Sequence, residues 1–558
     1  MKSLRGVAAS PGASVAPVWL HSQAPVDLPS DTVDDREAAI KLLREAIDTV
    51  AQTLEEQATK SSGELADVLE AQAMMARDPE LADSAERAIK SDGTNAARAI
   101  TDAGEGYAEA LAASESEYMA ARATDIRDVC SRIARRCLGG PETDIQAMDS
   151  PAIVVATELP PADVASLDKE LVKGIATQEG SRSSHTAIVA RALGIPAVVA
   201  VSGLIDAVKG NPVVALDGDE GTVHVDPDAH TRERTEKRTA ARTEYRAQLL
   251  ERVREGPSAT RDGRVIEMAG NVGSVVELRS ALEAGAEGVG LLRTELLYID
   301  RDEPPDEDEQ VALLEEMTGL LGDRRLVVRT FDFGADKPVP FLDLEAGPNP
   351  ALGVRGIRLA REHPELLATQ LRSITRAAQS GKLAVMAPMV AGVAEAKWFV
   401  EQVGHAGGID AGVEVGVMVE VPSAVLVAEK LAERLDFLSI GTNDLTQYLH
   451  AADRQQGALS YLQDPFSPAL LRAVEEICSA ARDKAWVGVC GEAAGDPAWA
   501  LVAVGLGVTE LSMGADALLE VRVAVGEHSF EQCRSLADEV LAAGEAEEAR
   551  RIAEGLVS

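Results

Sequence analysis

The stretch "FLSIGTN" (residues 437–443) shows the pattern that decides the fold of the C-terminal half. It is a short, largely apolar run that ends in glycine, threonine and asparagine. Comparable runs recur beyond residue 261 and are separated mostly by helical patterns. Eight such strand and helix units in one segment predict a (β/α)₈ barrel. The eight runs are "VIEMAGN" (265–271), "GVGLLR" (288–293), "LVVRTFD" (326–332), "LAVMAPM" (383–389), "EVGVMVE" (414–420), "FLSIGTN", "WVGVCGE" (486–492) and "ELSMG" (510–514).

The N-terminal half contains two kinds of sequence pattern, one helical and one rich in short β-strands. Apolar residues repeat at helical spacing from about residue 34 to 138, which predicts an all-helical insert of about four helices. Short β-rich runs from about 150 to 226 predict a compact α/β domain that the first twenty residues join. The expected fold class is therefore multidomain α/β. The expected domains are an α/β domain (1–20 and 145–227), a helical insert (30–143), a linker helix (228–257) and the barrel (258–558).

Charge and composition limit the possible partners. The 558 residues carry 54 Lys and Arg against 92 Asp and Glu, a net charge of −38. Phosphate backbones are bound by basic surfaces, so we expect no nucleic-acid partner. An anionic substrate would have to be held by locally concentrated arginines.

The cysteines and the apolar runs bear on location. Five cysteines at irregular spacing form no C-x-x-C pair, which favours reduced thiols over a disulfide scaffold or a zinc site. Pro11, Gly12 and Pro17 interrupt the apolar stretch at the N-terminus, which argues against a signal peptide. No run reaches the ~18 apolar residues of a membrane helix. We expect a cytoplasmic protein without membrane insertion.

Polar side chains follow the predicted barrel strands, where the active sites of such barrels lie. Arginine forks bind phosphate or carboxylate, two carboxylates suit Mg²⁺, and a thiol can give a proton near neutral pH. Taken singly, each residue also fits a salt bridge or a buried apolar thiol. Their shared position predicts a site for a small phosphorylated carboxylate, built from Arg293, Arg329, Asp332, Glu420, Asn443, Asp444 and Cys490.

One histidine stands in a serine-rich loop, "GSRSSHT" (180–186), just before a helical pattern. Free N–H groups at a helix start bind phosphoryl groups, and the imidazole of His185 is a nucleophile that could carry one. Taken alone, the segment is more typical of a capped helix with a surface histidine.

Together these segments resemble the enzyme I family of the bacterial phosphoenolpyruvate:sugar phosphotransferase system, over nearly the whole chain. The similar motifs are long and ordered: "AASPG" (8–12), "GSRSSHTAIVARALGIPAVV" (180–199), "NPALGVRGIRLA" (349–360), "GVMVEVPSAV" (416–425), "DFLSIGTNDLTQYLHAADR" (436–454) and "GVCGEAAGD" (488–496). Ser181 departs from the two glycines that many relatives have at this loop.

The resemblance implies Mg²⁺-dependent phosphorylation of His185 on Nε2 by phosphoenolpyruvate, with release of pyruvate. Cys490 would protonate the enolate, and Glu420 and Asp444 would hold Mg²⁺. Arg355 is a further candidate on the phosphate side. The implied substrate-binding residues are Arg293, Arg329, Asn443, Asp444 and Arg454.

The resemblance also implies partners. Phospho-His185 would pass its phosphoryl group to a histidine of the carrier HPr in the first step of sugar uptake, and the α/β domain would swing between barrel and insert about the linker. The insert would receive HPr, and the barrel would form a homodimer. Candidate HPr contacts, which also read as a plain solvated acidic face, are Glu64, Asp67, Glu70, Met74 and Met75.

Two other functions also agree with the sequence. One is a phosphohistidine enzyme of the pyruvate phosphate dikinase or phosphoenolpyruvate synthase type, although the sequence shows no Gly-rich ATP loop. The other is a catalytically silent regulatory homologue, although every candidate catalytic residue is present.

Overall fold

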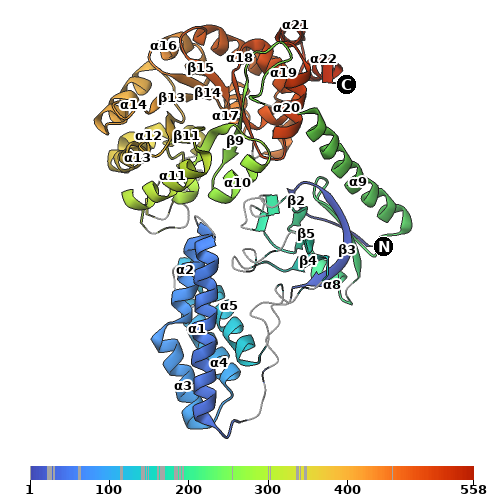
Figure 1. Ribbon diagram of the computed structural model, residues 1–558, viewed down its shortest axis with the longest axis vertical. Helices are drawn as coiled ribbons and strands as arrows, with labels where there is room; N and C mark the ends of the chain where they lie inside the picture. Colours follow the sequence, from blue (N-terminus) through green and yellow to red (C-terminus); the bar gives the residue numbers. More distant parts are fainter. Residues whose placement is uncertain are drawn as a thin grey trace. The chain divides into compact units, whose positions relative to one another are not determined.

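The chain forms two compact units in the computed structural model, residues 1–245 and 246–558 (Figure 1). None of the helices that the structure describes is both long and apolar enough to cross a lipid bilayer. The structure describes residues 2–557 apart from 22–27, 29–31, 61–63, 113–116, 140–144, 146–147, 149, 160–162, 164–166, 168–169, 181–185, 188–189, 192–193, 211, 254–255, 299–300, 302, 335–338, 340, 343, 345–348 and 455.

The first unit contains a mixed sheet to which both ends of its sequence contribute. The strands lie in the order β1-β8-β7-β3-β4-β5-β6-β2. β3, from the first twenty residues, pairs parallel with β4 and antiparallel with β7. The strands are β1 (Lys2–Arg5), β2 (Val7–Ser10), β3 (Ala13–Leu20), β4 (Ala152–Ala156), β5 (Val172–Thr177), β6 (Ala197–Val199), β7 (Val213–Asp217) and β8 (Thr222–Val225), with α8 (Leu204–Ala207) beside them.

Helices fill the sequence between β3 and β4. The described residues contain five of them, where the sequence pattern predicted about four. Only Arg77 and Asp78 separate the second helix from the third, and the Asp78 side chain accepts hydrogen bonds from Glu80 N and Leu81 N to start the latter. The helices are α1 (Arg36–Lys60), α2 (Glu64–Ala76), α3 (Pro79–Asp92), α4 (Ala96–Ala112) and α5 (Glu117–Cys137).

A buried ion network joins these helices to the α/β part of the first unit. Arg132 on α5 is fully buried, and its Nη2 lies 2.7 Å from Asp163 Oδ1. The other oxygen of Asp163 lies 3.1 Å from Nε2 of His21, directly after β3. Such a buried guanidinium needs carboxylate partners, and Asp128 adds a second at 2.8 Å from Nε.

The second unit is a closed barrel of parallel strands, as the sequence predicted (Figure 1). It has the ring order β9-β10-β11-β12-β13-β14-β15-β16. Each strand overlaps one of the eight apolar runs in the sequence. The ring closes where β16 pairs with β9. The strands are β9 (Glu267–Val272), β10 (Gly288–Arg293), β11 (Arg325–Arg329), β12 (Lys382–Ala387), β13 (Glu414–Val419), β14 (Phe437–Ile440), β15 (Trp486–Val489) and β16 (Glu510–Met513).

Helices surround the barrel and bury its outer face. A further helix, α9 (Ala229–Arg252), precedes it, and Leu249 of α9 packs on Leu519 and Val523. The barrel helices are α10 (Val275–Glu283), α11 (Glu307–Leu321), α12 (Ile357–Glu362), α13 (Pro364–Ala377), α14 (Val393–His405), α15 (Pro422–Val425), α16 (Ala428–Ala432), α17 (Thr442–Leu449), α18 (Pro468–Ala481), α19 (Pro497–Leu506), α20 (Leu518–Glu527), α21 (Phe530–Leu541) and α22 (Ala546–Val557), and the 3₁₀ turns are η2 (Thr294–Leu297), η3 (Pro350–Leu352), η4 (Gly457–Leu462) and η5 (Glu492–Gly495).

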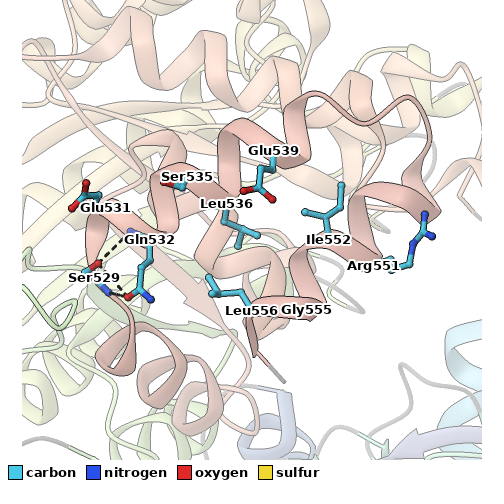
Figure 2. A pocket seen from close by; sticks show the side chains of 10 residues that line it. All are labelled: Ser529, Glu531, Gln532, Ser535, Leu536, Glu539, Arg551, Ile552, Gly555 and Leu556. Atoms are coloured by element: carbon cyan, nitrogen blue, oxygen red, sulfur yellow. Dashed lines mark hydrogen bonds between the residues drawn. The ribbon is translucent and has the colours of Figure 1, made fainter.

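The C-terminal helices pack closely against α19, which is apolar on nearly all sides. A side chain at Gly505 would come within 2.0 Å of the Cys533 carbonyl, so only glycine permits this approach of α19 to α21. Ser529 and Gln532 form a reciprocal capping box that starts α21, beside a groove between α21 and α22 (Figure 2).

One guanidinium closes the end of the barrel where the strands begin. The first residue of β11, Arg325, contacts the first residues of three other strands, with Nη2 2.5 Å from Glu267 Oε2 and 3.2 Å from Glu510 Oε2, and Nη1 3.3 Å from Glu414 Oε2. It also lies 4.0 Å over the Trp486 ring. Burial, followed by the nearby Glu267 charge, raises the pKa of Glu510 to about 8. A carboxyl whose pKa is raised on folding stabilises the fold fully at low pH and loses that contribution as pH rises through about 8.

We therefore predict that Arg325→Met lowers the free energy of unfolding of the barrel by about 3–5 kcal/mol at pH 8. The loss should be smaller at pH 5, where the uncompensated carboxyls can take up protons. Urea titrations at both pH values measure the difference. The exposed neighbour Arg324 supplies the control substitution Arg324→Met. An equal loss at the two pH values would contradict this account of the network.

Candidate functional site

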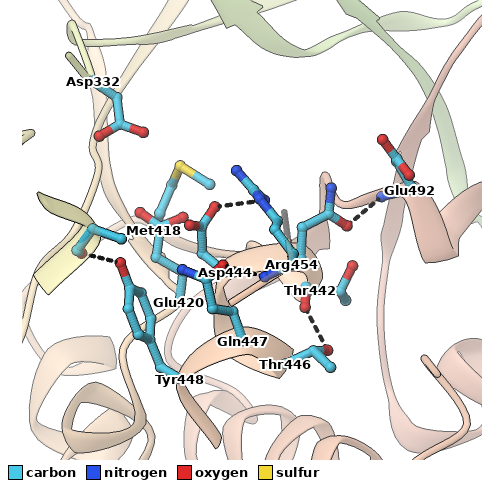
Figure 3. Close-up of polar contacts among 12 residues, drawn as sticks. Asp332, Met418, Glu420, Thr442, Asp444, Thr446, Gln447, Tyr448, Arg454 and Glu492 are labelled. Atoms are coloured by element: carbon cyan, nitrogen blue, oxygen red, sulfur yellow. Dashed lines mark hydrogen bonds and ion pairs between the residues drawn. The ribbon is translucent and has the colours of Figure 1, made fainter. Parts of the chain in front are cut away.

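The polar residues expected at the strand ends meet at the C-terminal end of the barrel. Arg329 ends β11, Glu420 follows β13, Asp444 lies in the first turn of α17, and Cys490 follows β15. Figure 3 shows Glu420, Asp444 and Arg454 side by side, with Asp332 at the upper left of the view. The structure thus brings together residues that are far apart in the sequence.

One predicted residue makes no ion pair with this group within the described part of the chain. Arg293 ends β10 with an exposed side chain, and no ion pair within the described part of the chain involves it. His185 and the neighbouring Ser181 lie outside the described residues.

A buried carboxylate links two arginines at this mouth. Asp332 receives two hydrogen bonds from Arg355, from Nε to Oδ1 at 3.2 Å and from Nη2 to Oδ2 at 2.7 Å. Arg329 Nη1 lies 3.4 Å from the same Oδ2. Arg329 also contacts Glu295 Oε1 through Nη2 at 2.9 Å. Both guanidiniums are buried, so this end of the barrel holds two guanidinium groups that are already oriented.

The charge state of Arg329 follows from its neighbours. Burial alone would lower the pKa of this guanidinium, but the carboxylates of Glu295 and Asp332 outweigh that effect and raise the pKa. Arg329 therefore stays cationic at every physiological pH. A buried permanent cation is suited to an anionic ligand.

Glu420 is fully enclosed, with 0% of its surface exposed, as is Asp332. Burial, followed by the charges of Asp444 and Asp332, raises the pKa of Glu420 to about 8. Its Oε1 accepts a 2.6 Å hydrogen bond from Met389 N, while Oε2 has no hydrogen-bond partner within the described residues. Met389 has φ 59°, a left-handed conformation that costs about 1–3 kcal/mol outside glycine, in the turn that directs this N–H at Glu420.

Asp444 completes a pair of carboxylates. Its Oδ2 lies 3.2 Å from Arg454 Nη1, and its Oδ1 lies 3.6 Å from Arg355 Nη1. Oδ1 is buried and accepts no hydrogen bond within the described residues. Two carboxylates with unused oxygens fit a divalent cation that takes its other ligands from water and substrate. The described ranges contain no cluster of three or more His, Cys, Asp or Glu suited to a metal.

The thiol of Cys490 lies in the inner layer of the barrel with only 4% of its surface exposed. Burial raises the pKa of this thiol to about 11. It therefore keeps its proton at neutral pH and can act as an acid rather than as a thiolate nucleophile. Asn443 Oδ1 accepts a 3.2 Å hydrogen bond from Glu492 N, which orients the amide at the start of α17.

Sequence reasoning missed some of the residues that shape this site. It did not single out Met389, because a left-handed backbone at a methionine leaves no compositional signal. It also missed Tyr448, whose hydroxyl donates to the Ala351 carbonyl at 2.5 Å and ties α17 to the segment before Arg355. Asp332 was found from its place after a strand, but its pairing with Arg355 was not.

Family models match three consecutive parts of the chain. Residues 5–122 match "PEP-utilising enzyme, N-terminal", residues 148–221 match "PEP-utilising enzyme, mobile domain", and residues 247–530 match "PEP-utilising enzyme, PEP-binding domain". The last of these contains every residue of the barrel mouth described above.

Full-length relatives agree with these matches. The chain is 44% identical to a phosphoenolpyruvate-protein phosphotransferase of Streptomyces coelicolor, over 100% of this chain and 99% of the relative. It is 37% identical to proteins of the same description from Bacillus subtilis and Staphylococcus carnosus, over 98% of both chains in each case. Because the similarity extends over all three matched segments and the whole length of these relatives, the chain belongs to the phosphoenolpyruvate-protein phosphotransferase family of PEP-utilising enzymes, the enzyme I family.

Proposed function

We propose that the protein transfers the phosphoryl group of phosphoenolpyruvate to its own His185 and then to a histidine of the phosphocarrier HPr, in the first step of sugar uptake by a phosphotransferase system. The observation that carries this proposal is the buried set of Arg329, Arg355 and the carboxylate pair at the barrel mouth. The relatives' names support the same reaction. The full-length match favours it over a dikinase-type enzyme and over a silent homologue.

Phosphoenolpyruvate would bind through its two anionic groups. The proposed substrate contacts are Arg293, Arg329 and Arg454, with Asn443 and Asp444 lining the site and Arg355 on the phosphate side. Arg329 and Arg355 are already held by Asp332, so little side-chain entropy would be lost when an anion binds. This preorganisation is the contribution that buried arginines make to electrostatic stabilisation of a transition state.

We propose Mg²⁺ as the cofactor, held by Glu420 and Asp444. When bound, it would neutralise the negative charge that develops on the enolate oxygen. Glu420 Oε2 and Asp444 Oδ1, which accept no hydrogen bond within the described residues, support this assignment.

Two side chains of this protein would carry out the proposed chemistry. His185 Nε2 attacks the phosphorus, the bond between phosphorus and the bridging oxygen breaks, and its electron pair stays on that oxygen as the enolate. Cys490 then gives its proton to the methylene carbon, which yields pyruvate and a thiolate that solvent reprotonates. The raised pKa of Cys490 supports this role, because the thiol is protonated when the enolate forms.

We propose that each domain has one task in the transfer of the phosphoryl group. Residues 1–20 and 145–227 would carry the phosphohistidine, 30–143 would bind HPr, 228–257 would form the linker, and 258–558 would bind phosphoenolpyruvate and form a homodimer. Met74 on α2, 69% exposed, suits an adaptable contact with the carrier. We place the protein in the cytoplasm, where phosphoenolpyruvate is available.

His185→Ala is expected to abolish labelling of the protein by ³²P-phosphoenolpyruvate in the presence of Mg²⁺. The wild type should carry acid-labile, base-stable label, as a phosphohistidine does. His405→Ala, an exposed histidine at the end of α14, serves as the matched control and should label normally. An unlabelled wild type, or label that persists in His185→Ala, would rule out the proposed acceptor.

Cys490→Ala is expected to slow pyruvate formation about 10²–10⁴-fold, the usual contribution of a positioned proton donor. Binding of phosphoenolpyruvate, measured by calorimetry, should change little, because the thiol pairs with no anion in this role. Cys478→Ala removes another buried thiol, on α18, and controls for loss of packing. If Cys490→Ala turned over at the rate of this control, the protonation step would have to be assigned elsewhere.

A further inference from the structure

The pairing of β10 with β11 stops just where the site begins. The last pair in this register is Arg293 with Arg329, and β10 then turns into the 3₁₀ segment η2 at Thr294. In a parallel ladder, the backbone groups of alternate residues face the same neighbouring strand. Thr330 N donates to Met386 O of β12 at 2.9 Å, so the Arg329 carbonyl and the Phe331 N–H face the side from which β10 has departed.

Two side chains take the place of the missing strand. Thr294 Oγ1 donates to the Arg329 carbonyl at 2.9 Å, and Phe331 N donates to Gln370 Oε1 at 3.1 Å. Gln370 Nε2 in turn donates to Thr294 Oγ1 at 3.1 Å. One amide therefore bridges the ends of two strands through three linked hydrogen bonds. Gln370 reaches this point from α13 on the outside of the barrel, and only 1% of its surface is exposed.

The backbone held in this way carries groups of the barrel mouth. Arg329 is one of the clamped residues, and Asp332 directly follows the other, Phe331. Asp332 N donates to Glu295 Oε1 at 2.7 Å. Asp332 then orients Arg355 through two hydrogen bonds. A shift of this short segment would move Arg329 itself and also Asp332, the carboxylate that orients Arg355.

We propose that Gln370 is a positioning residue for the barrel mouth: it completes the interrupted strand ladder and thereby sets Arg329 and Asp332 for the phosphorylated carboxylate. The inference rests on the proposed function, because it assigns those arginines to phosphoenolpyruvate. Gln370 itself touches none of the proposed reacting groups and acts only through the backbone of residues 329–332.

The same helix provides a matched control. Ser373 lies one turn further along α13 and is 0% exposed, so it is as deeply buried as Gln370. Its hydroxyl bonds to the carbonyls of Glu307 at 3.1 Å and Thr369 at 2.9 Å, and to no strand end. A general loss of packing on α13 would affect variants of both residues, whereas loss of the clamp would affect only Gln370.

The test compares Gln370→Met, which keeps the size of the side chain but removes its hydrogen bonds, with Ser373→Ala. Gln370→Met should raise the KM for phosphoenolpyruvate in the Mg²⁺-dependent labelling reaction about tenfold, with a smaller change in kcat, because removing a buried hydrogen-bond partner costs enough for that factor. Amide exchange at Phe331 should accelerate. Ser373→Ala should leave the KM and the Phe331 exchange at their wild-type values.

A second variant protects the test against a folding defect. Thr294→Val breaks the same chain of hydrogen bonds from its other end, and its effect on the KM should combine with that of Gln370→Met less than additively. Labelled variants whose KM equals that of the wild type, or that of Ser373→Ala, would refute the positioning role and leave the proposed function standing. A wild type that takes no label would refute the proposed function and, with it, this inference.

Discussion

The site depends on the carboxylate of Asp332, which compensates two buried guanidiniums at once. Without it, Arg329 would keep Glu295, but Arg355 would lose both of its hydrogen-bonded carboxylate oxygens while it stays buried, at a large desolvation cost. With it, both stay charged and oriented. In a chain of net charge −38, this is how buried guanidiniums are kept at one end of a barrel: they are paired with nearby carboxylates.

The two ends of the barrel contain similar charged groups that serve different purposes. Where the strands begin, Arg325 lies over the Trp486 ring and forms ion pairs with three glutamates. Its charge is therefore compensated by groups of the protein itself. At the opposite end, Glu420 and Asp444 keep unused oxygens. The second arrangement leaves room for a bound cation and an anion, and it lies where the loops after the strands converge.

Much of the barrel and of its polar end could be predicted from the amino-acid sequence alone. Apolar runs that end in Arg, Glu or Asn identify barrel strands and their outer ends, because a strand buried on both faces needs continuous apolar residues and the following loop does not. Gln370 could not be found in this way. It lies within a helix, and its importance arises because β10 turns away from β11, a long-range event that leaves no local pattern. The left-handed backbone of Met389 is hidden from sequence reasoning for the same reason.

The sequence by itself determined the residue types at the strand ends, the family and the candidate phosphohistidine, since each of these is written in short contiguous motifs. Only the tertiary structure decided which of those side chains meet: Arg329 and Arg355 on one carboxylate, Glu420 beside Asp444, and Gln370 between two strand ends. The physical reason is that ion pairs and hydrogen bonds depend on distances of a few ångströms between groups tens of residues apart, and barrel closure sets those distances.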